Sequence, residues 1–406
     1  MDNFRRVFEL YGYGEVVTPA FEHLELLEAK AGEEVKEQIY WFEDKAGRKL
    51  GLRFELTTSI ARIIANNPMI PKPIRYYYIQ PVWRYEEPQK GRLREFWQAG
   101  IELMGLSKPE ADAEIIAVTR RALRSIGLTN LIFRVNDRKV MEKLFEYFGF
   151  PRRLWESIFR LVDKIDKMDE DSIIQEITKL GIDKDSVISF LGLIKEKRSI
   201  SDTLGLLRDL LGDSVSYMES LFNILEEWYN IKYPEISYDL SIVRGLAYYT
   251  GFVFETYVES MEDIGAVAGG GRYDNLIQIV GGPRLPATGM AIGVERVYEI
   301  ASRLGLLSID YSIADVLVVA ISQELSSMAS RISESLREHG IRTILDISGR
   351  RLRGVLEYAD KNRVRFVIIL GTKDYKNGEC TVKDMMRWAD NKVKIDKVVH
   401  FILNNK

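Results

Sequence analysis

Two β-rich runs on either side of a charged loop restrict the fold of this chain more than any other feature. Residues 76–83 and 93–104 are rich in aromatic and branched side chains, and the polar segment Arg84–Arg92 between them contains Pro and Gly. This pattern predicts a long β-hairpin with a charged tip. A hairpin joins antiparallel strands, so we expect the chain to fold around an antiparallel sheet.

The second run of this hairpin carries an unusual set of side chains on one face. If no bulge interrupts the strand, alternation places Arg92, Arg94, Phe96, Gln98 and Glu102 on the same side. Guanidinium groups bind phosphate, a ring can stack on a base, and polar edges give selectivity. The face therefore fits a phosphorylated planar ligand, although a solvated sheet face with cross-strand ion pairs would show the same residues.

The rest of the sequence divides into three parts. Residues 1–145 and 232–308 mix strand-like and helical segments, residues 146–231 have apolar side chains at helical spacing, and residues 312–406 alternate apolar strands with helices. These patterns predict an α+β core, a helical insertion and a C-terminal α/β domain. We expect no membrane span and no secretory signal, because no apolar run of about 18 residues occurs and the first residues are polar.

Cysteine and histidine are scarce, which excludes several kinds of chemistry. The sequence contains one cysteine, Cys380, and three histidines, His23, His339 and His400. A disulfide network needs pairs of cysteines, and a structural zinc site needs about four clustered Cys or His ligands. We therefore predict no protein-bound metal, chemistry based on carboxylates, arginines, hydroxyls and backbone groups, and a cytoplasmic location.

The C-terminal part is more basic than the rest of the chain. Residues 312–406 contain 17 Lys and Arg against 12 Asp and Glu, an excess of five positive charges, whereas the whole chain has a net charge of −3. A basic module on an acidic body suggests a polyanionic partner.

Three further segments combine glycine with arginine. Residues 241–251 place Arg244 among glycines and paired tyrosines, residues 269–274 read GGGRYD, and residues 287–296 run from a small-residue strand into a helix that begins near Arg296. Tight glycine turns and helix starts both allow close approach to an anion. Each segment taken alone is also explained as a structural turn or a core strand.

The order of these segments resembles the three motifs of class II aminoacyl-tRNA synthetases and, more narrowly, the histidyl-tRNA synthetase family. Residues 84–98 are similar to motif 2, and residues 243–249 and 270–274 are similar to the two histidine-specific signatures. The resemblance covers nearly the whole chain and includes a C-terminal anticodon-type domain. The segment from Tyr11 to Pro19 is similar to motif 1, which implies a homodimer.

This resemblance implies an activity and a set of residues. The activity is ATP-dependent ligation of L-histidine to tRNA(His) through a histidyl-adenylate, with ATP entering as its Mg²⁺ complex. The implied catalytic residues are Arg84 and Arg244, and the implied ATP contacts are these two together with Glu86, Arg92, Phe96 and Arg296. The implied histidine contacts are Glu55, Leu56, Thr57, Gln98, Glu102, Tyr248 and Tyr249, and the implied anticodon contacts are Arg350, Arg351 and Arg353.

Two features depart from the family pattern, and two other functions compete with ligation. The family usually has an aspartate where this chain has Ala247, and it usually has an Arg-Gly-Thr-Arg-Asp stretch before the first helix that this sequence does not contain. A catalytically silent relative could bind histidine as the regulatory subunit of a phosphoribosyltransferase complex, and an inactive synthetase scaffold could simply bind RNA. Because Arg84, Arg244 and the basic C-terminal domain are all present, the ligase is favoured.

Overall fold

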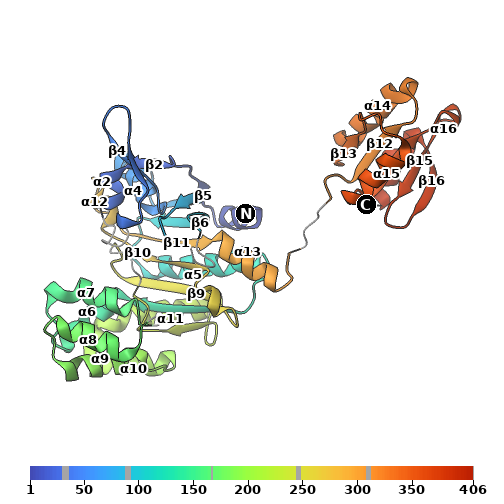
Figure 1. Ribbon diagram of the computed structural model, residues 1–406. Coiled ribbons are helices and arrows are strands. Elements are labelled where there is room, and N and C mark those ends of the chain that lie inside the picture. Colours follow the sequence, from blue (N-terminus) through green and yellow to red (C-terminus); the bar gives the residue numbers. More distant parts are fainter. Residues whose placement is uncertain (30–35, 87–92, 166–167, 244–247, 308–311, 406) are drawn as a thin grey trace. The chain divides into compact units, whose positions relative to one another are not determined.

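A computed structural model describes residues 1–29, 36–86, 93–165, 168–243, 248–307 and 312–405. Contacts divide the chain into two compact units, Met1–Leu307 and Ser308–Lys406 (Figure 1). The predicted helical insertion, residues 146–231, lies within the first unit. Among the described helices none is both long and apolar enough to cross a membrane.

The first unit is built on an eight-stranded sheet with the order β1-β5-β6-β11-β10-β9-β7-β8. Its pairs are antiparallel except at the two edges, where β1 runs parallel to β5 and β8 runs parallel to β7. The predicted hairpin forms the pair β5–β6. The strands are β1 (Gly14–Glu15), β5 (Ile74–Trp83), β6 (Glu95–Met104), β7 (Leu131–Asp137), β8 (Ile236–Tyr238), β9 (Phe252–Val258), β10 (Ala268–Arg272) and β11 (Ala287–Gly293).

The sheet buries both of its faces, because successive side chains of a strand point to opposite sides. One face packs against α1 (Asp2–Leu10), α5 (Pro109–Arg124), α6 (Arg138–Tyr147) and α13 (Val294–Arg303), and Tyr77 belongs to this core. The other face packs against α4 (Thr57–Asn66) and α12 (Leu276–Ile279), and the neighbouring Tyr78 belongs to that second core. The residues implied in histidine binding lie on the second face.

The insertion is helical, as its sequence predicts. It contains α7 (Trp155–Val162), α8 (Glu170–Lys179), α9 (Lys184–Lys195), α10 (Ile200–Leu211) and α11 (Ser216–Tyr229). The side chains of Asp169, Asp183 and Ser199 accept hydrogen bonds from backbone N–H groups at the starts of α8, α9 and α10, which stabilises each helix start. Figure 1 shows α7 to α10 gathered at one end of the first unit, while α11 packs along α5.

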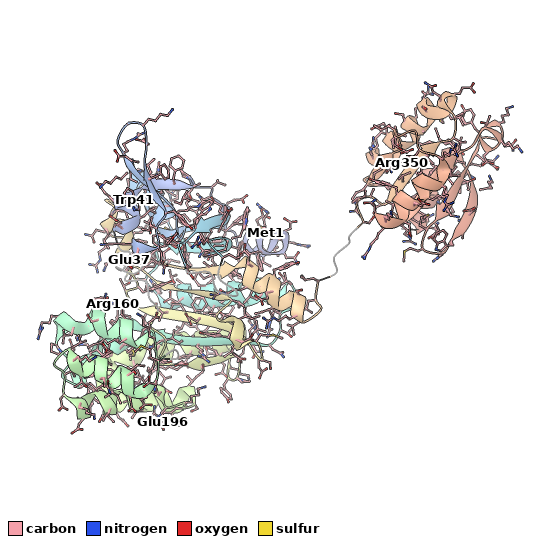
Figure 2. The ribbon with its side chains drawn as sticks, viewed as in Figure 1. Met1, Glu37, Trp41, Arg160, Glu196 and Arg350 are labelled. Atoms are coloured by element: carbon pink, nitrogen blue, oxygen red, sulfur yellow. The ribbon has the colours of Figure 1, made fainter. Side chains whose placement is uncertain are left out.

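A small antiparallel sheet completes the first unit. It consists of β2 (Phe21–His23), β4 (Lys49–Leu52) and β3 (Trp41–Glu43), in that order, beside the short helix α2 (Leu24–Glu28). Trp41, labelled in Figure 2, is exposed on this sheet. The chain leaves β4 and enters α4 through Arg53–Leu56, so this sheet places the first histidine-binding candidates.

The second unit has a five-stranded mixed sheet with the order β13-β12-β14-β15-β16. The strands β13 (Thr343–Leu345), β12 (Val316–Ala320) and β14 (Phe366–Leu370) are parallel, and the hairpin of β15 (Glu379–Asp384) and β16 (Ala389–Lys394) is antiparallel. Its helices are α14 (Ser326–Glu338), α15 (Leu352–Lys361), α16 (Thr372–Lys376) and α17 (Val398–Asn405). The predicted α/β alternation is confirmed.

Candidate functional site

Two adjoining cavities lie over strands β6, β10 and β11 of the first unit. The small cavity has a volume of about 50 Å³ and the large cavity about 210 Å³, and Arg84, Gln98, Gly269 and Ala291 line both of them. The small cavity is also lined by Glu55, Thr57, Tyr78, Tyr248, Tyr249, Tyr273, Gly289 and Met290. The large cavity is also lined by Glu86, Leu93, Phe96, Glu255, Ala266, Val267, Ala268, Gly293, Glu295 and Arg296.

The β5–β6 hairpin supplies side chains to both cavities. Its register runs without interruption from the pair Ile74–Met104 to the pair Trp83–Glu95. No bulge interrupts the pairing in this range, so Phe96, Gln98 and Glu102 share a face, as strand alternation predicts. Arg94 precedes the strand, and its guanidinium lies 4.6 Å from the centre of the Tyr85 ring. Its backbone carbonyl oxygen accepts from the N–H of Arg84 at 2.9 Å, so the pairing continues to this residue, and its place on the same face stays a prediction.

Glu102 lies at the base of the small cavity and is surrounded by hydroxyl groups. Its side chain is 1% exposed. The Thr57 hydroxyl donates to Glu102 Oε1 at 2.7 Å, the Tyr78 hydroxyl donates to the same atom at 3.4 Å, and the Tyr273 hydroxyl donates to Oε2. Glu102 does not itself line the cavity, whereas its three hydroxyl partners do.

Gly289 makes room for this carboxyl group. It is the β11 partner of Glu102, and a Cβ at this position would lie 1.9 Å from Glu102 Oε2 and 2.7 Å from the carbonyl oxygen of Ile101. No side chain fits there without displacing the carboxyl group or the strand. The glycine within residues 287–296 is therefore a packing requirement of the site.

Burial changes the acidity of Glu102. Removal from water raises its pKa to about 8, and the nearby Glu55 carboxylate acts in the same direction, while hydrogen bonds from Tyr273 and Thr57 partly offset the rise. At neutral pH the carboxyl group is therefore protonated in the free protein. A perturbed acid beside a polar cavity is typical of a functional site.

Glu55 and Thr57 lie where the chain enters α4. Glu55 accepts backbone hydrogen bonds from Thr57 at 2.5 Å and Thr58 at 2.9 Å, so its carboxylate caps the helix start. A carboxylate has about four acceptor positions, and backbone groups of the described residues use two of them, so a ligand cation can bind at the others. Leu56, which the sequence analysis includes with these residues, is fully buried in the core and does not line the cavity.

Gln98 and the tyrosine pair complete the small cavity. The Oε1 atom of Gln98 is buried and has no hydrogen-bond partner among the residues that the structure describes. Tyr248 and Tyr249 are each 6% exposed, and their ring centres lie 4.9 Å apart. An unsatisfied buried acceptor is costly. A ligand that brings an N–H donor to Gln98 would remove that cost.

Arg84 connects the two cavities. Its Nε donates to the carbonyl oxygen of Phe54 at 3.0 Å, and its guanidinium carbon lies 5.1 Å from the centre of the Phe96 ring. These contacts fix the orientation of the side chain at the boundary between the cavities. A guanidinium held there can bind two oxygens of a phosphate or carboxylate at once.

The large cavity has the features of a site for a planar phosphorylated ligand. Small residues of β10 and β11 form its floor and leave room for a flat ring, and Phe96 offers a ring for stacking. Arg296 lies in the first turn of α13, where its Nη1 donates to the carbonyl oxygen of Ala266 at 2.7 Å. The predicted strand-to-helix step at residues 287–296 is confirmed.

Some of the predicted residues fall elsewhere. Arg92, Arg244 and Ala247 lie outside the described residues. Arg350, labelled in Figure 2, lies in the second unit together with Arg351 and Arg353. All three are exposed at the start of α15, the guanidinium of Arg350 lies 4.9 Å from the Tyr358 ring centre, and Arg353 pairs with Glu357 at 3.0 Å.

The sequence analysis missed two tyrosines of the small cavity. Tyr78 lies opposite Gly100, where a Cβ would lie 2.4 Å from the Tyr78 hydroxyl. The glycine between Gln98 and Glu102 was a usable signal, because it marks the space for a large neighbour. Tyr273 stands in the GGRYD segment, but only the fold shows that its hydroxyl reaches Glu102.

No group of three or more His, Cys, Asp or Glu side chains in the described part of the chain is arranged to hold a metal ion. Carboxylates do line the large cavity, namely Glu86, Glu255 and Glu295. Glu295 is held by the backbone N–H of Trp97 at 2.9 Å and 3.0 Å. Any metal ion that reaches this cavity with its ligand would meet oxygen donors, as Mg²⁺ prefers.

Comparisons with known proteins identify the family of this chain. The family model described as histidyl-tRNA synthetase matches residues 1–297, and the anticodon binding domain model matches residues 315–405. The histidine–tRNA ligase of Pyrococcus furiosus is 41% identical over 99% of this chain and 94% of its own length. That of Pyrobaculum islandicum is 38% identical over 95% and 89%.

A solved structure has the same fold. The crystal structure of histidyl-tRNA synthetase from Nostoc sp. PCC 7120 superposes with a TM-score of 0.84 at 27% identity, covering 100% of this chain and 94% of that one. A family model over most of the chain, full-length relatives and a shared fold lead to one conclusion. The chain belongs to the histidyl-tRNA synthetase family of class II aminoacyl-tRNA synthetases.

Proposed function

We propose that this chain activates L-histidine with ATP and transfers it to tRNA(His), with histidine in the small cavity and ATP, as its Mg²⁺ complex, in the large cavity. The observation that supports this most strongly is the buried Oε1 of Gln98, which has no partner among the described residues and lies in a cavity that Arg84 and four tyrosines also line. The two cavities share Arg84 and Gln98, so ligands in them would meet at these side chains.

Histidine would be held at both of its ends. The α-amino group would donate to Gln98 Oε1 and to the free acceptor positions of Glu55, with Thr57 beside them. The imidazole would lie against Tyr249, Tyr248 and the hydroxyls that surround Glu102. Because these groups are buried and polar, an apolar side chain in their place would leave them without partners, and the site would reject it strongly.

Activation needs charge stabilisation more than a general base. The histidine carboxylate would attack the α-phosphorus of ATP, forming a P–O bond while the bond to pyrophosphate breaks. The nucleophile is already charged, so positioning and neutralisation of the phosphate oxygens dominate. Arg84 would contact the carboxylate and the α-phosphate, with Arg244 on the other side. Glu86 and Arg92 would contact the nucleotide, and Phe96 and Arg296 would enclose the adenine ring.

Features of the second unit support tRNA as a partner, and features of the sheet edge support a second copy of this chain. The basic start of α15, with Arg350, Arg351 and Arg353, would contact the tRNA anticodon. The edge strand β1 lies in the motif 1 segment beside exposed apolar side chains, Leu10 and Val17, which supports a homodimer through this edge. We place the enzyme in the cytoplasm, where tRNA is charged.

Histidine-dependent exchange of pyrophosphate into ATP tests this proposal. Arg84→Ala should lower the exchange rate by about 100-fold or more, since a charge-stabilising donor contributes about 3–4 kcal/mol to such a reaction. Arg284→Ala is the matched control, because Arg284 is exposed and lines neither cavity. Near-normal exchange by Arg84→Ala would contradict the proposal. Histidine binding without exchange by the unsubstituted chain would favour the regulatory subunit instead.

A further inference from the structure

A buried ion pair connects the sheet to helix α5 on the face opposite the small cavity. Arg272 of β10 is 2% exposed, and Asp112 of α5 is fully buried. The guanidinium donates to both carboxylate oxygens of Asp112, from Nε at 3.1 Å and from Nη2 at 2.8 Å. Its Nη1 donates to the carbonyl oxygen of Leu106 at 2.9 Å. This fork fixes the position of the β10 backbone relative to α5.

A tyrosine of the insertion hydrogen-bonds to this ion pair. Tyr217, in the first turn of α11, donates its hydroxyl hydrogen to Asp112 Oδ2 at 2.5 Å. The Arg272 guanidinium carbon lies 6.0 Å from the centre of the Tyr217 ring. Hydrogen bonds to a buried carboxylate are short and strong. Tyr217 therefore helps to fix the rotamer of Asp112 and, through it, that of Arg272.

The backbone at Arg272 is linked to two groups of residues that line the small cavity, the tyrosine pair and Tyr273. Its carbonyl oxygen accepts from the N–H of Thr250 at 2.7 Å, and Thr250 directly follows the tyrosine pair. Tyr273 is the next residue of the chain, and its hydroxyl donates to Glu102. Because successive side chains alternate across a strand, Arg272 reaches α5 while Tyr273 reaches the cavity.

We propose that Tyr217 is a positioning residue through which the helical insertion holds the histidine pocket in its binding geometry. The proposal rests on the assignment of histidine to the small cavity. The path from Tyr217 through Asp112 and Arg272 ends at residues of that cavity. Phe96 and Arg296, the ring and cation expected to enclose adenine, come from β6 and α13, and Arg296 donates to the carbonyl oxygen of Ala266 and not to a residue of this path. Strand β10 supplies Ala268 and Gly269 to the large cavity, but these two residues lie at the end of the strand away from Arg272. Loss of the Tyr217 hydroxyl should therefore weaken histidine binding and spare ATP binding.

The test compares Tyr217→Phe with the unsubstituted chain in pyrophosphate exchange, with histidine and ATP varied separately. The expected result is a rise of about 10-fold in KM for histidine, since small displacements of positioning groups have effects of this order or larger. KM for ATP should change less than about 2-fold. Tyr229→Phe is the matched control, because Tyr229 lies at the other end of the same helix, whereas the hydrogen bond to Asp112 comes from Tyr217.

The possible outcomes separate this inference from the proposed function. An unchanged KM for histidine in Tyr217→Phe would overturn the inference alone, and so would an equal rise in both KM values, which indicates a general structural defect. A thermal unfolding midpoint equal to that of Tyr229→Phe, together with the selective rise, would support it. No histidine-dependent exchange by the unsubstituted chain would refute the proposed function and the inference together.

Discussion

Replacement of Glu102 by glutamine should change how the stability of the first unit depends on pH. The folded protein keeps this carboxyl group protonated up to a pKa of about 8, against an ordinary value of 4.5 in the unfolded chain. Between these values the folded state holds a proton that the unfolded state has released, so stability falls as pH rises. The full interval corresponds to about 5 kcal/mol at about 1.4 kcal/mol per pH unit. Glutamine keeps the shape of the side chain and cannot ionise.

Urea unfolding followed by tryptophan fluorescence measures this effect, because five of the six tryptophans lie in residues 1–307. Between about pH 5 and pH 8, the unfolding free energy of the unsubstituted chain should fall relative to Glu102→Gln by about 1.4 kcal/mol per pH unit, and the difference should level off above that range. Glu227→Gln, at an exposed position of α11, is the control. A difference that stays constant from pH 5 to pH 9 would refute the assigned environment of Glu102.

Two further predictions concern the cavity wall and the second unit. Gly289→Ala should lower the rate of histidine activation by about 100-fold, because its Cβ would lie 1.9 Å from Glu102 Oε2. Gly205→Ala is the control and should leave the rate unchanged, because a Cβ at this position of α10 meets no atom within 4 Å. Equal rates for the two variants would contradict the role of Gly289 in packing. Neutralising Arg350, Arg351 and Arg353 together should weaken tRNA binding, and the slope of log affinity against log salt should shrink by about 2 to 3. Adenylate formation should stay intact, and a loss of exchange in this triple variant would contradict the division of labour between the units.

The sequence predicted the fold correctly where neighbouring residues alone determine the structure. The hairpin was visible in its β-rich runs and charged tip, and the face that carries Phe96, Gln98 and Glu102 followed from strand alternation alone. The helical spacing of the insertion and the α/β alternation of the second unit are also local patterns. In each case the residues that determine the structure lie within a few positions of one another.

The contacts that complete the site are long-range, so periodicity could not provide them. Arg272 and Asp112 are 160 residues apart in the sequence, and Tyr273 and Glu102 are 171 apart. Alternation indicates which residues share a face, but not which strands are neighbours in the sheet.

The surroundings of Glu102 could not be predicted from the sequence and are known only from the structure. The resemblance implied a direct contact with imidazole, whereas in the free protein three hydroxyls already surround the carboxyl group. Its burial and raised pKa follow from that arrangement and from the glycine across the sheet. The proposed histidine pocket is therefore a network in which Tyr78 and Tyr273, like Thr57, hydrogen-bond to Glu102.

The most direct test of the central claim is pyrophosphate exchange by the unsubstituted chain, with each of the twenty amino acids supplied in turn. The two cavities and their shared arginine predict exchange with L-histidine alone, at least about 1,000-fold above any apolar amino acid, because the polar groups of the small cavity need partners. No exchange with histidine, or comparable exchange with leucine or phenylalanine, would contradict the account.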